Sequence, residues 1–256
     1  MTTIAVFSDL HGNTPALQAL LTDLEEVRPE LVVNLGDIAS GGVDPAGTMA
    51  LLATRPEIIA VRGNHERQLT TLEPERMSRS DRLAHDTLAP DEIAALGRLP
   101  ERKEVVSGVL AFHGSPSDDL RYLLQTVDPS APDALREATD DEVIDRLGAD
   151  AGRYEVYLCG HTHLQRVRRL ADGSVVVNPG SLGWPAYDDD APYPHLVEAG
   201  SPQARYTLLR STDAGWEIVE KALDYDVESA VAMAEGNARA DVAHALRTGR
   251  VSRSEG

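Results

Sequence analysis

The sequence contains a single cysteine, Cys159, among 256 residues. One thiol excludes an intrachain disulfide and fits a reducing compartment. Because Cys159 ends an apolar run, we interpret it as a small buried side chain rather than a nucleophile. Aromatic residues are also scarce, at 4%, so the core has to be built mainly from Leu, Val, Ile and Ala.

Long apolar runs and an excess of basic residues are also missing. No run approaches the ~18 apolar residues that span a bilayer, and no signal-like start is present. We therefore expect a cytoplasmic protein without membrane attachment. Lys and Arg number 24 against 42 Asp and Glu, which gives a formal net charge of −18. This charge argues against stable nucleic-acid binding, but it permits a phosphate substrate if bound cations reverse the charge locally.

The first third of the chain alternates strand-like and helix-like segments. Residues 2–8, 31–35 and 57–61 are apolar and β-branched, which predicts buried strands. Between them, Asn13-Thr14-Pro15 and Asp44-Pro45 combine a capping residue with a proline, the pattern of a helix start. The alternation is typical of a mainly parallel sheet in an α/β protein.

The remaining segments predict further elements in one domain, residues 1–247, followed by a flexible tail, 248–256. Segment 188–203 is expected to be a loop with a solvated aspartate run, and the acidic segment 115–152 is either a wall of a substrate cleft or surface packing. The expected elements are helices within 67–99 and over 227–247, hairpins over 101–113 and 165–177, and strands over 204–210 and 215–223.

Metal-binding residue types gather in five short clusters, each directly after a strand-like run. Loops that leave one edge of a sheet can converge on one place. In two clusters a pair of candidate ligands is separated by one residue, a spacing that puts both side chains on one side of an extended backbone. Each cluster alone is weak, but five at strand ends indicate a shared metal site. The clusters are Asp9-Leu10-His11, Gly36-Asp37, Gly63-Asn64-His65, His113-Gly114 and His161-Thr162-His163.

The candidate ligands are imidazole, carboxylate and amide groups, without thiolate. This set suits Mn, Fe, Zn, Ni or Co, whereas Mg and Ca prefer more oxygen ligands. Two such cations about 3.5–4 Å apart can clamp both the attacking and the leaving oxygen of a displacement at phosphorus.

With these motifs, the chain resembles a calcineurin-like metallophosphoesterase of the small prokaryotic type. Val43-Asp44-Pro45, Ser115-Pro116 and Asn178-Pro179-Gly180-Ser181 add to the match, which runs from about residue 4 to 183. The resemblance implies a fold of the α/β (α+β) class. In this fold, a four-layer αββα sandwich, two mixed β-sheets pack face to face between helices.

The resemblance also implies two divalent transition-metal ions, with manganese favoured. The implied activity is hydrolysis of phosphomonoesters or phosphodiesters by a metal-bridging hydroxide, on a small phosphate ester or a nucleotide. The implied ligands are three for each ion and a bridging Asp37: Asp9, His11 and His163 for the first ion, and Asn64, His113 and His161 for the second.

His65 differs from the other motif histidines because its neighbour Asn64 is the proposed ligand. By resemblance, His65 is the general acid that protonates the leaving oxygen; the alternative is a structural hydrogen bond. Asn13 would either contact a phosphate oxygen or cap the following helix, and Arg62 is a candidate substrate contact. The remaining histidines are expected at the surface: His85, His195 and His244.

The chain departs from the serine/threonine protein phosphatases of this superfamily at the second motif. Their Gly-Asp-x-x-Asp-Arg-Gly has a carboxylate where this chain has Ser40 and an arginine where it has Gly41. The first change removes a group that would orient His65, and the second removes a phosphate-binding guanidinium, for which Arg62 or Arg121 would have to compensate. A protein phosphatase or a dinucleoside polyphosphate hydrolase is therefore an alternative only. A non-catalytic metal-binding scaffold is disfavoured because every ligand position is filled.

Overall fold

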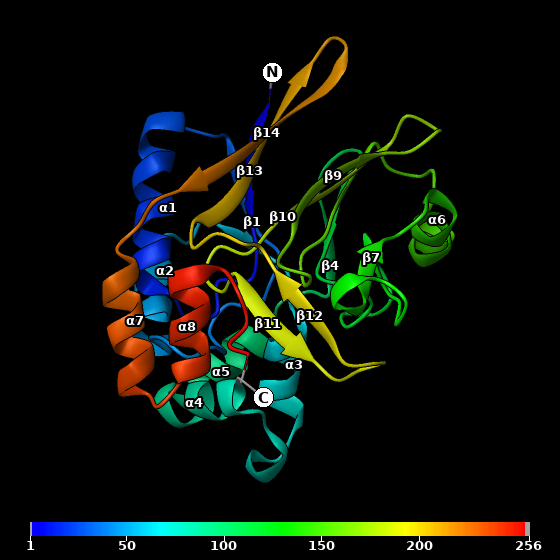
Figure 1. Ribbon diagram of the computed structural model, residues 1–256. Helices are drawn as coiled ribbons and strands as arrows, with labels where there is room; N and C mark the ends of the chain where they lie inside the picture. Colours follow the sequence, from blue (N-terminus) through cyan, green and yellow to red (C-terminus); the bar gives the residue numbers. More distant parts are fainter. Residues whose placement is uncertain (1, 254–256) are drawn as a thin grey trace.

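The computed structural model describes residues 2–253, in which two five-stranded β-sheets lie face to face (Figure 1). In the first sheet the order is β14-β13-β1-β2-β3. Strands β1, β2 and β3 are parallel, whereas β13 runs antiparallel to both β1 and β14. Its strands are β1 (Thr3–Phe7), β2 (Leu31–Asn34), β3 (Ile59–Ala60), β13 (Ala204–Thr212) and β14 (Gly215–Leu223).

The second sheet is also mixed, with the order β4-β5-β8-β10-β9. Strands β5, β8 and β10 are parallel, and β4 and β9 pair antiparallel at the two edges. The two hairpins at 101–113 and 165–177 are confirmed as β4–β5 and β9–β10. The strands are β4 (Arg102–Val106), β5 (Val109–Phe112), β8 (Val156–Leu158), β9 (Gln165–Arg169) and β10 (Val175–Pro179).

Side-chain alternation along the strands assembles the layers. Ile4 and Val6 face the apolar core between the sheets, where they meet Val109 and Val156 of the second sheet. Neighbouring Phe7 points the other way, against the leucines of helix α1. Helices cover both outer faces, so the expected four-layer αββα sandwich is confirmed. The helices are α1 (Thr14–Val27), α2 (Pro45–Ala53), α3 (Asn64–Thr71), α4 (Arg79–Thr87), α5 (Pro90–Gly97), α6 (Asp140–Leu147), α7 (Val227–Gly236) and α8 (Ala240–Thr248).

The start of α1 follows from its sequence. The Asn13 side chain accepts a hydrogen bond from the backbone N–H of Ala16 (3.1 Å) and so caps the helix. Pro15 lies in the first turn, and Leu17 and Leu20 are fully buried against the first sheet. Among residues 2–253, no helix is long and apolar enough to cross a membrane.

Two segments differ from the sequence-based expectation. The expected loop 188–203 contains most of a hairpin, β11 (Ala186–Asp189) with β12 (His195–Glu198). His195 is buried there rather than at the surface, because its Nε2 pairs with the hydroxyl of Tyr122 (2.9 Å). The single helix expected over 227–247 is instead the pair α7 and α8, and α8 extends into the expected tail, of which residues 254–256 lie outside the described part.

The acidic segment 115–152 forms a small structure of its own beside the second sheet. It contains a two-stranded sheet, β6 (Gln125–Val127) with β7 (Leu135–Glu137), and helix α6. Val143 and Leu147 of α6 pack against the outer face of the second sheet. Leu123 and Leu124 from its first half are buried in the same cluster, so the segment is anchored at both of these places.

Candidate metal centre

All five metal-binding clusters lie at the carboxyl ends of parallel strands. In the first sheet they follow β1, β2 and β3, and in the second sheet they follow β5 and β8. Because the two sheets face each other, the five loops converge at the end of the sandwich where these strands end. Nine non-glycine residues among the described ones have a positive φ, and five of these are proposed ligands. Such conformations cost roughly 1–3 kcal/mol and gather at functional sites. The five are Asp9, His11, Asp37, His161 and His163.

One group of metal-capable atoms comprises Asp9, His11 and His163, whose ligand atoms lie within 4.8 Å of one another. The Nε2 atoms of His11 and His163 are 3.0 Å apart. Nε2 of His163 lies 3.5 Å from a carboxylate oxygen of Asp9. Asp9 is fixed in turn, because its carboxylate accepts the backbone N–H of His161 (3.1 Å). This group draws on loops of both sheets.

A second group comprises Asp37, His113 and His161, also within 4.8 Å. Nε2 of His113 lies 3.2 Å from Oδ2 of Asp37 and 3.1 Å from the amide oxygen of Asn64. Asp37 also belongs to a third group with His11 and His65. Asp37 is thus a member of the second group and is connected to the first group through His11.

The unshared nitrogens of the histidines fix which atom faces the centre. Nδ1 of His11 donates to the carbonyl of Ser40 (2.6 Å), and Nδ1 of His163 donates to that of Trp184 (2.5 Å). A carbonyl only accepts, so these nitrogens carry the proton and each Nε2 turns a lone pair inward. Two lone pairs 3.0 Å apart repel each other unless a cation lies near them. The donor set therefore fits a metal ion.

Burial and neighbouring charges set the pKa values at the centre. Burial lowers the pKa of His11 to about 3, and the neighbouring His163 ring adds to the effect. Burial also lowers the pKa of His161 to about 4, with His113 adding to the effect. For His113, burial opposes the charge, but Asp37 and Asp9 outweigh it and raise the pKa to about 10. Positive charge is therefore favoured beside the two aspartates, where a dication would lie.

His65 pairs with a carboxylate that the sequence analysis did not identify. Its Nδ1 donates to Oδ1 of Asp81 on α4 (2.7 Å), and Asp81 is only 1% exposed. The hydroxyl of Ser78 donates to the other oxygen of Asp81 (2.7 Å) and holds it in place. Although burial opposes the charged form of His65, Asp37 and Asp81 raise its pKa to about 9. His65 therefore carries a proton at neutral pH.

The second and third motifs are locked together by Glu66 of α3. Its buried carboxylate accepts the backbone N–H groups of Gly63, Asp37 and Ile38, at 2.8–2.9 Å. A Cβ atom on Gly41 would lie 1.9 Å from the carbonyl oxygen of His11. The arginine that protein phosphatases carry at that position therefore has no room here.

An open cavity of about 420 Å³, which we call the central cavity, leads to the centre. Its wall includes His11, Asp37, Asn64, His65 and the arginines Arg79 and Arg239. Arg239, from the break between α7 and α8, donates to the carbonyl of Gly41 (3.0 Å) and to the hydroxyl of Ser80 (2.8 Å). The sequence gave no indication that Arg239 belongs to this cavity, because its hydrogen-bond partners Gly41 and Ser80 lie about 160–200 residues away in the chain.

The two expected substrate contacts, Asn13 and Arg62, do not line the central cavity. Asn13 caps α1, and its amide nitrogen donates to the carbonyl of Gly183 (2.9 Å) and the hydroxyl of Tyr225 (3.2 Å). The capping alternative therefore describes its contacts. Arg62 donates to Glu101 and lines a separate cavity, and Arg121 pairs with Asp145 (2.8 Å). Neither arginine lines the central cavity.

Comparison with known proteins gives matches over nearly the whole chain. The model of the calcineurin-like phosphoesterase superfamily domain matches residues 2–198. A metallophosphoesterase from Sphaerobacter thermophilus has a TM-score of 0.73 at 20% identity, covering 97% of this chain and 100% of that one. A hypothetical protein from Pyrococcus horikoshii OT3 has a TM-score of 0.71 at 18% identity, covering 98% and 100%. No curated protein matches the chain.

Proposed function

The chain belongs to the calcineurin-like phosphoesterase superfamily, and we propose that it hydrolyses phosphomonoesters or phosphodiesters. The reaction would take place at a centre of two divalent transition-metal ions, with manganese as the favoured metal. The observation that carries the proposal is that Asp37 shares one group of metal-capable atoms with His113 and His161 and another with His11, which itself belongs to the group of Asp9 and His163. One ion would be held by Asp9, His11 and His163, the other by Asn64, His113 and His161, with Asp37 between them.

Bound there, the two cations would neutralise the phosphate charge and lower the pKa of a water molecule into the neutral range. The chain's own residues balance the charge of the cations and orient the ligands. Buried Asp9 and Asp37 balance part of the positive charge. The backbone carbonyls of Ser40, Leu35 and Trp184 keep the ligating imidazoles in one tautomer and one orientation.

His65 is proposed as the general acid. It lines the central cavity, and its Nδ1 is occupied by Asp81, which leaves Nε2 as the nitrogen that faces a substrate. A pKa near 9 keeps this proton available at neutral pH, where the leaving oxygen needs it. Asp81 is a positioning residue, since it acts through His65. It supplies the carboxylate that the chain lacks at Ser40.

The charge around the central cavity favours substrates with one phosphate. Beyond the proposed ligands and His65, its wall contains two arginines, Arg79 and Arg239, and three aspartates, Asp188, Asp189 and Asp241. Arg239 is already paired with Asp241 (2.8 Å). A polyphosphate chain would gain no surplus of positive charge here, which counts against a dinucleoside polyphosphate. The blocked arginine position at Gly41 likewise counts against a protein phosphatase.

The proposal is tested with protein stripped of metal and resupplied with Mn²⁺. We expect hydrolysis of p-nitrophenyl phosphate or of its bis ester only after metal is added. Asp37→Ala should lose both activity and bound metal. His65→Ala should keep the metal but lower kcat by roughly 10²–10⁴-fold, the usual contribution of a general acid.

The matched control is His85→Ala, which removes a partly exposed histidine in the last turn of α4, outside the proposed centre. It should leave both activity and metal content unchanged. Full activity in metal-free protein, or in Asp37→Ala, would contradict the proposed centre. Unaltered turnover in His65→Ala would remove only the acid role.

A further inference from the structure

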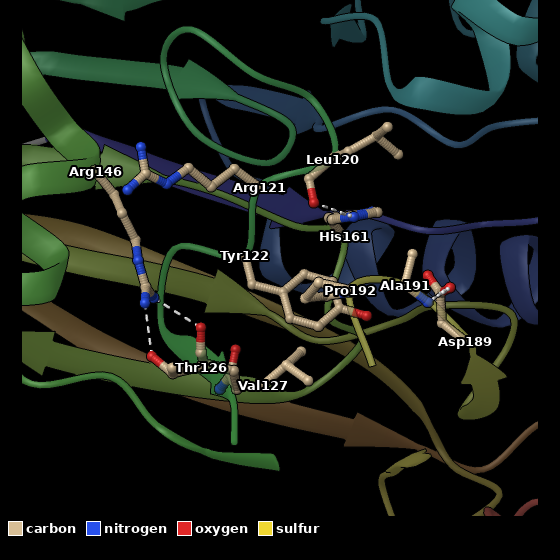
Figure 2. Close-up of a pocket in the computed structure, with 11 residues that line it drawn as sticks. Leu120, Arg121, Tyr122, Thr126, Val127, Arg146, His161, Asp189, Ala191 and Pro192 are labelled. Carbon is tan, nitrogen blue, oxygen red and sulfur yellow. Dashed lines mark hydrogen bonds between the residues drawn. The ribbon is translucent and has the colours of Figure 1, made fainter. Parts of the chain in front are cut away.

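A second cavity, of about 440 Å³, opens beside the metal centre, and we call it the lateral cavity. Its walls come from the 120–127 part of the acidic segment, from Arg146 of α6 and from the turn at 189–192 (Figure 2). His161, Leu120 and Asp189 line both the lateral and the central cavity. A ligand with its phosphate at the centre could therefore extend its other end into the lateral cavity.

The lateral cavity offers an aromatic and apolar surface. The hydroxyl of Tyr122 is engaged by Tyr187 (2.7 Å) and His195 (2.9 Å), so the part of Tyr122 left to the cavity is its ring. The ring stands edge-on to His161, with the centroids 5.1 Å apart. Leu120 at the junction is 51% exposed and adds apolar surface beside the Tyr122 ring.

One polar group in this wall lacks a partner. Gln125 is only 2% exposed, and its Oε1 has no hydrogen-bond partner within residues 2–253. A buried acceptor left unpaired costs about 1–3 kcal/mol, so it calls for an explanation. A glutamine amide carries a donor and an acceptor side by side. It can bind a ligand edge that has the complementary pair.

The wall around Gln125 is held in place before any ligand arrives. Arg146 donates to the carbonyls of Leu123 (3.1 Å) and Gln125 (2.7 Å) and to the hydroxyl of Thr126 (2.6 Å). The contacts with Gln125 and Thr126 tie β6 to α6, and Figure 2 draws Arg146 beside Thr126. The carbonyl of Leu120 accepts from Nε2 of His161 (3.1 Å), which ties the segment to a proposed metal ligand. Such preorganisation lowers the entropy cost of binding.

We infer that the lateral cavity binds the nucleobase of a nucleoside phosphate whose phosphate lies at the metal centre. Bases bind to proteins through an aromatic or apolar face together with hydrogen bonds to their edge. An amide side chain pairs well with a base edge that has a donor beside an acceptor. Tyr122, Leu120 and Gln125 supply these two features. The inference rests on the proposed function for the position of the phosphate, and it selects nucleotides among the phosphate esters that the family resemblance implies.

The test compares ligands that differ only in the base. Mn²⁺-loaded protein is assayed on whichever p-nitrophenyl ester it hydrolyses, with ribose 5-phosphate or each of the four ribonucleoside 5′-phosphates as inhibitor. We expect at least one nucleotide to inhibit about tenfold more tightly than ribose 5-phosphate, the worth of one good base contact. Gln125→Leu, which keeps the volume but removes the amide, should bring this ratio down toward one.

Gln18→Leu is the matched control, because Gln18 is exposed on α1, a helix that contributes no residue to the lateral cavity. It should keep the wild-type ratio. If the protein hydrolyses the ester but no nucleotide exceeds ribose 5-phosphate, or if Gln125→Leu keeps the ratio, the inference is overturned and the phosphoesterase proposal stands.

The phosphoesterase proposal can also fail while the base site stands. If neither p-nitrophenyl ester is hydrolysed, the same ligand pairs are compared by titration calorimetry on the Mn²⁺-loaded protein. A nucleotide preference that Gln125→Leu removes would support the base site although the phosphoesterase proposal fails. Equal affinities for the nucleotides and ribose 5-phosphate would overturn the base site as well.

Discussion

At the scale of single residues, the proposed acid role of His65 depends on its contact with Asp81. The pKa of His65 is raised to about 9, so His65 is protonated at neutral pH and loses its proton as the pH rises through that value. In Asp81→Asn one of the three carboxylates that raise this pKa is gone, while Asp37 and Glu66 remain. We expect the alkaline limb of the kcat–pH profile to move to lower pH, with metal content unchanged.

The control for this prediction is Asp86→Asn, an exposed aspartate on the same helix. Its profile should coincide with that of the wild type. An alkaline limb that stays in place in Asp81→Asn would show that Asp81 does not act through His65. A purely structural role of Asp81 would lower kcat equally at all pH values instead.

Residues of the centre differ in how far the sequence reveals them. Asp9, His11 and Asp37 directly follow apolar strands, and their position in the chain already indicates that their side chains meet. Asp81 lies within a helical segment whose Ser78-x-x-Asp81 spacing predicts only a helix start. Its contact with His65 arises from the angle at which α4 packs, and no local pattern encodes that angle.

At the scale of elements, the break between α7 and α8 brings Arg239 to the centre. Arg239→Leu would leave the carbonyl of Gly41 and the hydroxyl of Ser80 without their donor. It would also remove the cation–π contact with Trp184, whose ring centroid is 5.4 Å away. Each buried polar group that loses its partner costs about 1–3 kcal/mol. We therefore expect the free energy of unfolding to fall by roughly 2–4 kcal/mol, measured by urea denaturation.

Arg247→Leu on α8 is the matched control for Arg239→Leu. Arg247 is 43% exposed and pairs with exposed glutamates, so its removal should change the free energy of unfolding by no more than about 0.5 kcal/mol. Equal effects of the two substitutions would mean that the contacts of Arg239 do not hold the C-terminal helices against the centre.

Elements with strong periodicity could be predicted, and elements without it could not. The β1–α1–β2 unit has an apolar strand, a cap with proline and leucines at helical spacing. Strand β11, by contrast, ends in Asp188 and Asp189, residues that are rare in strands. The helix break follows Gly236 and Asn237, residue types that commonly end helices, and Ala238 then takes a positive φ of 56°. The sequence therefore carried a signal for this break, which the prediction of one helix over 227–247 did not use.

At the scale of the whole molecule, the sandwich creates the centre by bringing two sheets together. The alternation of strands and helices predicts a mainly parallel sheet, but it does not predict that β1 and β8 end on opposite sides of one site. That arrangement depends on apolar contacts between the sheets, such as Val6 and Val33 with Val109 and Val156. Only the family resemblance indicated it from the sequence.

Because the net charge of the chain is −18, binding of an anionic substrate depends on the local charge of the proposed metal centre. An anionic substrate meets repulsion from most of the surface, and screening in salt confines that repulsion to about 10 Å. Two dications beside Asp9 and Asp37 would leave a positive centre within this negative molecule. Phosphate binding by this chain is therefore expected to require the metals as well as the protein.

The central claim, that five strand-end loops hold two cations around Asp37, is tested most directly by anomalous X-ray diffraction from Mn²⁺-loaded crystals at the manganese edge. Two peaks per chain are expected, one among Asp9, His11 and His163 and the other among Asn64, His113 and His161, with Asp37 in contact with both. A single peak, or peaks that lie away from Asp37, would contradict the claim.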